Sequence, residues 1–131
     1  MAVIKRYTGD GEAHSWEGVE VQRYGDGASL GASVQRLIGR QEEAPTFALR
    51  YFEIQPGGYS VLESHAYEHG VVIFRGSGTV LLGDEEHPVR TGDVVYIPGW
   101  ERHQFRNPGP DVLGFLCIVP ANRPRSAHSV D

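Results

Sequence analysis

The chain has 131 residues, about the size of one domain, and 40% of them are apolar, which is enough for a single core. Its formal net charge is −5 and no run of lysine or arginine forms a basic face, which argues against a nucleic-acid partner. No apolar stretch approaches the roughly 20 residues that cross a bilayer, so we expect no membrane partner either.

The cellular compartment is inferred from the cysteine count and the first residues. Cys117 is the only cysteine, so it forms no disulfide within the chain. Residues 1–10 lack the basic flank and apolar stretch of a signal peptide. We therefore expect a cytoplasmic protein.

The first part of the chain, residues 1–45, is expected to be an N-terminal arm that belongs to the same domain. It contains one or two strands, such as Val19 to Tyr24. Asp26 to Arg40 has apolar residues near helical spacing, so this segment is the one considered for a short helix, although its glycines weaken that prediction.

Residues 46–119 are predicted to form the core of an all-β domain. Glycine and proline, 17 and 8 in the whole chain, divide it into short apolar pieces, and the gaps between these pieces leave no room for crossover helices. This pattern is typical of a sandwich or barrel, and residues 120–131 are expected to be a flexible tail. The predicted strands are Phe47–Ile54, Val61–His65, His69–Arg75, Thr79–Leu82, Val94–Ile97, His103–Arg106 and Val112–Val119.

Four side chains in this core form a candidate metal site. Side chains alternate along a strand, so Glu63 and His65 share one face. A hairpin loop over residues 66–68 places His69 opposite His65, and a sheet closed into a barrel brings His103 beside them.

Three imidazoles and one carboxylate suit a single divalent transition metal, namely Mn, Fe, Ni, Zn, Co or Cu. Two coordination positions of an octahedral ion then stay open for water or substrate. One alternative has Glu63 pointing to solvent, which leaves a three-histidine site, and another is a barrel of the same fold that binds no ion.

Two motifs in this region resemble those of the cupin superfamily of small jelly-roll β-barrels. The first, usually written G-x5-H-x-H-x3,4-E-x6-G, has the spacing found here in Gly57-x5-Glu63-x-His65-x3-His69-x6-Gly76. The second, G-x5-P-x-G-x2-H-x3-N, is met by Gly92, Pro98, His103 and Asn107. The resemblance implies a small single-domain bacterial cupin with a cupin-type jelly-roll barrel and a bound metal.

The chain departs from the family pattern at two ligand positions and in one turn. Glu63 stands where the family usually has histidine, and His69 stands where it usually has glutamate. Trp100 replaces a glycine of the second motif. The resemblance therefore supports metal binding more firmly than it supports any one reaction.

The expected function is that of a metal-dependent enzyme acting on a small organic ligand, by dioxygenase, decarboxylase, isomerase or lyase chemistry. No Ser/His/Asp or Cys/His nucleophile is visible, and no catalytic side chain is assigned. The alternative is a non-enzymatic binding or sensing module with a bound metal. Outward Val72 and Phe74 offer apolar surface for a partner chain, so we expect a homodimer.

Overall fold

The protein folds almost entirely as β-strands, as the sequence predicts. The computed structural model describes residues 1–9 and 14–124, and the predicted tail beyond residue 124 lies outside the described residues. Within the described residues, no helix is long and apolar enough to cross a membrane. The elements are β1 (Val21–Arg23), β2 (Leu30–Ile38), the short helix η1 (Arg40–Glu42), β3 (Phe47–Tyr59), β4 (His69–Arg75), β5 (Ser77–Leu82), β6 (Glu85–Arg90), β7 (Val94–Ile97), β8 (His103–Arg106) and β9 (Leu113–Pro120).

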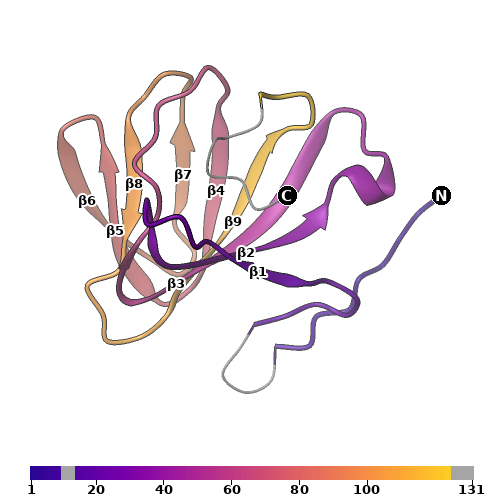
Figure 1. The fold of residues 1–131 in the computed structure, drawn as a ribbon, viewed down its shortest axis with the longest axis horizontal. Coiled ribbons are helices and arrows are strands. Elements are labelled where there is room, and N and C mark those ends of the chain that lie inside the picture. The colour runs from indigo at the N-terminus through magenta and orange to yellow at the C-terminus, as the bar shows by residue number, and fades with distance from the viewer. Residues whose placement is uncertain (10–13, 125–131) are drawn as a thin grey trace.

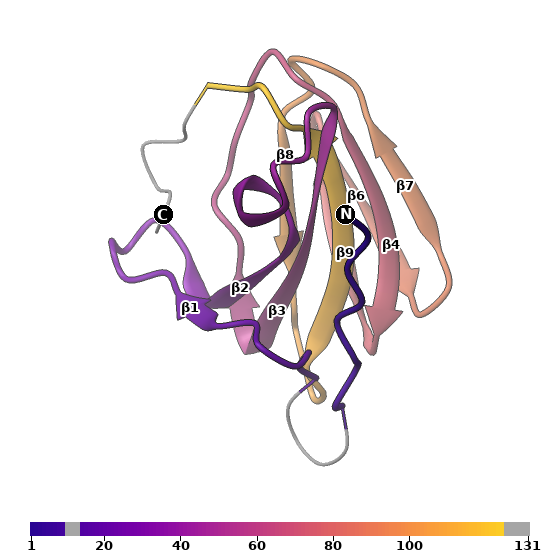
Figure 2. The same ribbon diagram turned by 90° about the vertical axis from the view of Figure 1, so that its right-hand side faces the viewer.

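The strands form one antiparallel sheet in the order β6-β5-β8-β3-β9-β4-β7, with β2 also paired to β3 and β1 paired to β2. The sheet curls around one interior, as Figures 1 and 2 show. This curl brings the first residues of β8 and β4 together, although the two strands are not neighbours in the sheet. The rings of His69 and His103 lie 4.9 Å apart between centroids.

Alternation along the central strands builds the core on the inner face of the curl. Residues that pair across β3 and β9 point the same way, so Phe52 lies beside Phe115 and Arg50 beside Cys117. The phenyl rings of Phe52 and Phe115 stack at 5.4 Å. Burial of each such side chain contributes about 1.5–3 kcal/mol to the free energy of folding. This wall carries the candidate site.

The prediction of a short helix in Asp26 to Arg40 is wrong, because Leu30–Ile38 forms β2. Four consecutive residues of β2, Ala32 to Gln35, are buried, so both faces of the strand are covered. In a strand that is buried on both faces, apolar and polar residues no longer alternate, and its sequence then resembles that of a buried helix. The antiparallel pairing of β2 with β3 makes this segment a strand.

Two further strand boundaries differ from prediction. β3 continues past Ile54 to Tyr59, and β6 occupies Glu85–Arg90, where the acidic residues indicated only a turn. The turn itself is confined to Gly83 and Asp84, with Gly83 at φ +61°. In the sheet order β6 is the terminal strand, a position that tolerates exposed charges.

Part of the N-terminal arm packs on the outer face of the sheet. Trp16 lies 5.0 Å from Tyr51 and 6.1 Å from Phe74 between ring centroids, and Tyr7 lies 5.9 Å from Phe74. The arm thus covers Phe74, one of the two residues expected to face a partner chain.

Candidate metal centre

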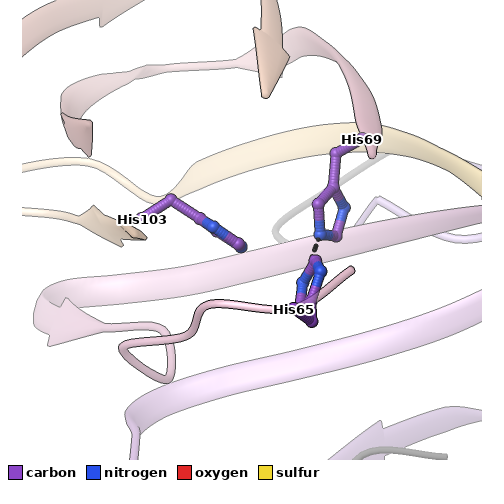
Figure 3. A group of neighbouring side chains, drawn as sticks. All are labelled: His65, His69 and His103. Carbon is purple, nitrogen blue, oxygen red and sulfur yellow. Dashed lines mark hydrogen bonds between the residues drawn. The ribbon is translucent and has the colours of Figure 1, made fainter. Parts of the chain in front are cut away.

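Three histidines converge on one point of the interior. The ligand nitrogens of His65, His69 and His103 all lie within 4.8 Å of one another. Figure 3 shows the rings approaching from three segments, namely the loop before β4, the start of β4 and the start of β8. The structure therefore brings together all three histidines that the sequence singled out.

The loop that carries Glu63 and His65 is not the strand that the sequence predicts. Of the residues from Val61 to His65, only Glu63 pairs with another strand, through an isolated bridge to His103. The two residues exchange backbone hydrogen bonds of 3.0 and 2.9 Å, and the Trp100 N–H donates to the His65 carbonyl. His69 pairs with Ile97 on β7, so the expected hairpin between His65 and His69 does not form.

Hydrogen bonds at Nδ1 turn two of the rings toward the common point. His65 Nδ1 lies 2.9 Å from the carbonyl oxygen of Tyr67, and His103 Nδ1 lies 2.8 Å from that of Glu101. A carbonyl oxygen only accepts, so Nδ1 carries the proton in each neutral ring and Nε2 keeps its lone pair. This is the arrangement that metal-binding histidines need.

The third ring, His69, is held by a thiol. Its Nδ1 lies 2.9 Å from Cys117 Sγ, and its Nε2 lies 2.9 Å from His65 Nε2. Two nitrogens bound at right angles to one ion, each at about 2.1 Å, are separated by about 3.0 Å. When His69 Nδ1–H donates a hydrogen bond to the sulfur, the Nε2 lone pairs of His69 and His65 face each other at the spacing of two ligands of one metal ion.

Burial favours the neutral forms of His69 and His103. It lowers the pKa of His69 to about 2, with smaller contributions from His103 and the positive charge of Arg50. Burial also lowers the pKa of His103, although the hydrogen bond to the Glu101 carbonyl opposes this effect. Both rings are therefore unprotonated near neutral pH and available to a cation.

The Glu63 carboxylate lies near two of the three histidines. Its Oε2 lies 3.6 Å from His65 Nε2 and 3.9 Å from His103 Nε2, and its side chain is 27% exposed. The group of ligand atoms within 4.8 Å of one another consists of the three histidines. Imidazole nitrogens of this kind can hold a metal ion, and a nearby carboxylate is compatible with such a site.

His69 and His103 line a cavity of about 510 Å³ on the inner face of the sheet. This volume lies in the range of small-molecule sites. Its wall includes three phenylalanines, the side chains of His69 and His103, and several arginines.

Three polar side chains of the wall were not assigned to the site from the sequence. Tyr67 stacks on His65 at 3.8 Å, nearly parallel, and burial raises the pKa of its phenol. Cys117 holds His69, and Arg50 lies beside Cys117. The sequence alone does not decide which face of the sheet Arg50 occupies, and no sequence signal places Tyr67 over an imidazole.

Comparison with known proteins identifies the family. The family described as "Cupin domain" matches residues 50–119. The chain is a cupin. Its curled antiparallel sheet is therefore a cupin-type jelly roll.

Relatives support this assignment over most of the chain. The 1-methylthio-D-xylulose 5-phosphate methylsulfurylase of Rhodospirillum rubrum is 43% identical over 111 residues, which cover 84% of this cupin and 71% of that protein. The crystal structure of an R. rubrum cupin-2 domain protein is similar with a TM-score of 0.81 at 40% identity, covering 86% of this chain and 76% of that one. A cupin 2 conserved barrel protein from Rhodopseudomonas palustris has the same TM-score at 38% identity, covering 94% and 83%.

Proposed function

We propose that this cupin is a metal-dependent enzyme that acts on a small organic molecule inside its barrel. The observation that carries the proposal is the convergence of three imidazole nitrogens and one carboxylate at the wall of the cavity. His65, His69, His103 and Glu63 hold one divalent ion of Mn, Fe, Ni, Zn, Co or Cu. When bound, such an ion polarises an oxygen of the substrate as a Lewis acid.

The chain's own residues bind the substrate and exclude water around that point. Phe52, Phe105 and Phe115 give the cavity an apolar wall. Because the pKa of Tyr67 is raised by burial, its phenol stays protonated and offers a hydrogen-bond donor at neutral pH. Arg50 supplies a fixed positive charge in the same wall.

The substrate class that we favour is a small phosphorylated hydroxy-ketone. The name of the R. rubrum relative describes a ketose phosphate with a methylthio group, and 84% of this chain aligns with it. A hydroxy-ketone offers oxygen donors to a metal, and the cavity has room for a molecule of that size. Cleavage or isomerisation of such a ketose phosphate is the reaction class we propose.

The experiment starts with protein purified without a nickel affinity resin. Metal content is measured, and the loaded protein is incubated with pentulose 5-phosphates that do or do not carry a 1-methylthio group, with ³¹P and ¹H NMR as the readout. We expect turnover that His103→Ala abolishes. Tight binding without turnover across the panel would contradict the enzyme proposal and favour a binding or sensing module.

A further inference from the structure

Two arginines and a cysteine form a row across the inner wall of the cavity. Arg36 on β2 pairs with Arg50 on β3, and Arg50 pairs with Cys117 on β9. Residues paired in this way share a face of the sheet, with Cβ atoms about 5 Å apart. All three line the cavity. Two positive charges therefore stand side by side within it.

Arg50 is fixed in place but has no counter-ion. Its Nη2 donates to Cys117 Sγ at 3.5 Å, and its guanidinium carbon lies 4.8 Å from the centroid of the Phe52 ring. Among the described residues, no carboxylate forms an ion pair with it. Its buried Nε has no hydrogen-bond partner there either. A buried donor without a partner is costly, which points to a ligand that accepts from it.

A third arginine reaches the same region from the segment after β9. Arg123 lines the cavity, and its Nη1 donates to the carbonyl of Pro120 at 2.9 Å. Arg50 lines the same cavity, so the two arginines contribute to one wall.

Two acidic residues that line the cavity, Glu42 and Glu63, contact groups other than Arg50. Glu42 accepts from Lys5 Nζ at 2.8 Å and from the Gly39 N–H at 2.7 Å. Glu63 faces the histidines, and Glu20 is exposed at the rim.

We propose that Arg50, together with Arg36 and Arg123, forms a subsite for the phosphate group of the substrate. This inference rests on the proposed function. It adds which residues bind the phosphate group of the substrate and where in the cavity that group lies. A single arginine satisfies a carboxylate through two parallel hydrogen bonds, whereas a phosphate monoester has three anionic oxygens and about two negative charges, which suit several guanidinium groups.

The position of the subsite limits the length of the substrate. The Cys117 thiol contacts both the Arg50 guanidinium, at 3.5 Å, and the His69 ring, at 2.9 Å. A molecule whose oxygen donors face the histidines and whose phosphate lies a few bonds away spans the two positions. The subsite thus fits a short phosphate ester and does not fit a long or neutral ligand.

The test measures binding of glycerol 3-phosphate, with glycerol and lactate as neutral and carboxylate probes, by isothermal titration calorimetry. The full chain is used as purified and again after chelator treatment, so that binding at the arginines is separated from binding at a metal. We expect glycerol 3-phosphate to bind more tightly than lactate, and glycerol not to bind. Arg50→Gln should weaken the binding about tenfold or more in both preparations, because charge-assisted hydrogen bonds are lost.

Arg50→Lys, which keeps the charge but loses the planar fork, should give an intermediate affinity. Arg90→Gln is the matched control, since Arg90 is exposed on β6 away from the cavity. Thermal unfolding verifies that each variant is folded. Unchanged affinity in folded Arg50→Gln, or equal affinity for lactate and glycerol 3-phosphate, would overturn the subsite. If the protein binds no metal, Arg50→Gln should still weaken the binding of glycerol 3-phosphate. The experiment therefore distinguishes failure of the phosphate subsite from failure of the proposed metal-dependent function.

Discussion

His69 on β4 and Cys117 on β9 meet at the floor of the cavity, with His69 Nδ1 2.9 Å from Cys117 Sγ. The thiol is buried, and burial raises its pKa, so it stays protonated near neutral pH. A buried thiol that accepts a hydrogen bond from Nδ1–H fixes the ring so that Nε2 faces His65. Such partners of a ligand control both its orientation and its basicity.

Replacement of this thiol should weaken metal binding without removing a ligand. Cys117→Ala leaves His69 without a partner for Nδ1, and we expect metal affinity to fall about 10- to 100-fold. Cys117→Ser keeps a hydrogen-bonding atom and should lose less. Chelator competition measures both affinities, and equal affinity in Cys117→Ala and the parent would show that the contact has no role in the site.

The exchanged ligand order predicts a rescue. Glu63→His combined with His69→Glu restores the commoner cupin order and keeps three imidazoles and one carboxylate, so the double variant should retain its metal. Glu63→Ala alone should bind the metal less tightly, because the carboxylate that lies 3.6 Å from His65 Nε2 is removed. Affinity equal to that of the parent in Glu63→Ala would show a three-histidine site.

Acid should destabilise the metal-free protein through His69. Burial first, and neighbouring positive charges second, lower its pKa to about 2 in the folded state, whereas the unfolded chain binds this proton near pH 6.5. The unfolded state therefore binds more protons below pH 6.5, and the free energy of unfolding falls as pH decreases, by up to about 1.4 kcal/mol per pH unit from this group.

Urea unfolding of chelator-treated protein between pH 7 and pH 5 measures that slope. His69→Gln should reduce the dependence of the unfolding free energy on pH by up to about 1.4 kcal/mol per pH unit, which is the contribution of one proton. His87→Gln, at an exposed position of β6, is the control and should leave the slope unchanged. A slope that His69→Gln does not alter would contradict the assignment.

The outer face of three neighbouring strands predicts a homodimer. Val94 and Tyr96 on β7, Val72 on β4 and Ile118 on β9 are 74%, 61%, 37% and 48% exposed, and their registers place them side by side. An apolar patch of this kind is typical of an interface. We expect light scattering to give twice the chain mass of 14.4 kDa.

Charge placed on this patch should separate the chains. Val94→Lys should shift the mass toward that of the monomer, whereas Leu30→Lys on β2, which also replaces an exposed apolar residue, should not. A monomer at micromolar concentration in the parent protein would contradict the dimer.

The sequence predicts local features of this fold better than contacts between distant strands. The bounds of β4, β7 and β8 match the prediction, because alternation and flanking turn residues are local signals. The convergence of the histidines also follows from motif spacing. The row of Arg36, Arg50 and Cys117 depends on the registers of β2 with β3 and of β3 with the distant β9, which no local pattern determines.

The metal content per chain tests the proposed metal centre most directly. The protein is purified without nickel, reconstituted separately with Mn(II), Fe(II), Ni(II), Zn(II), Co(II) and Cu(II), passed through a desalting column and analysed by elemental mass spectrometry beside His103→Ala. We expect about one ion per parent chain for at least one metal, and a large loss in His103→Ala, whose ring lies close to those of His65 and His69. Occupancy well below one half for every metal, or equal occupancy in His103→Ala, would contradict it.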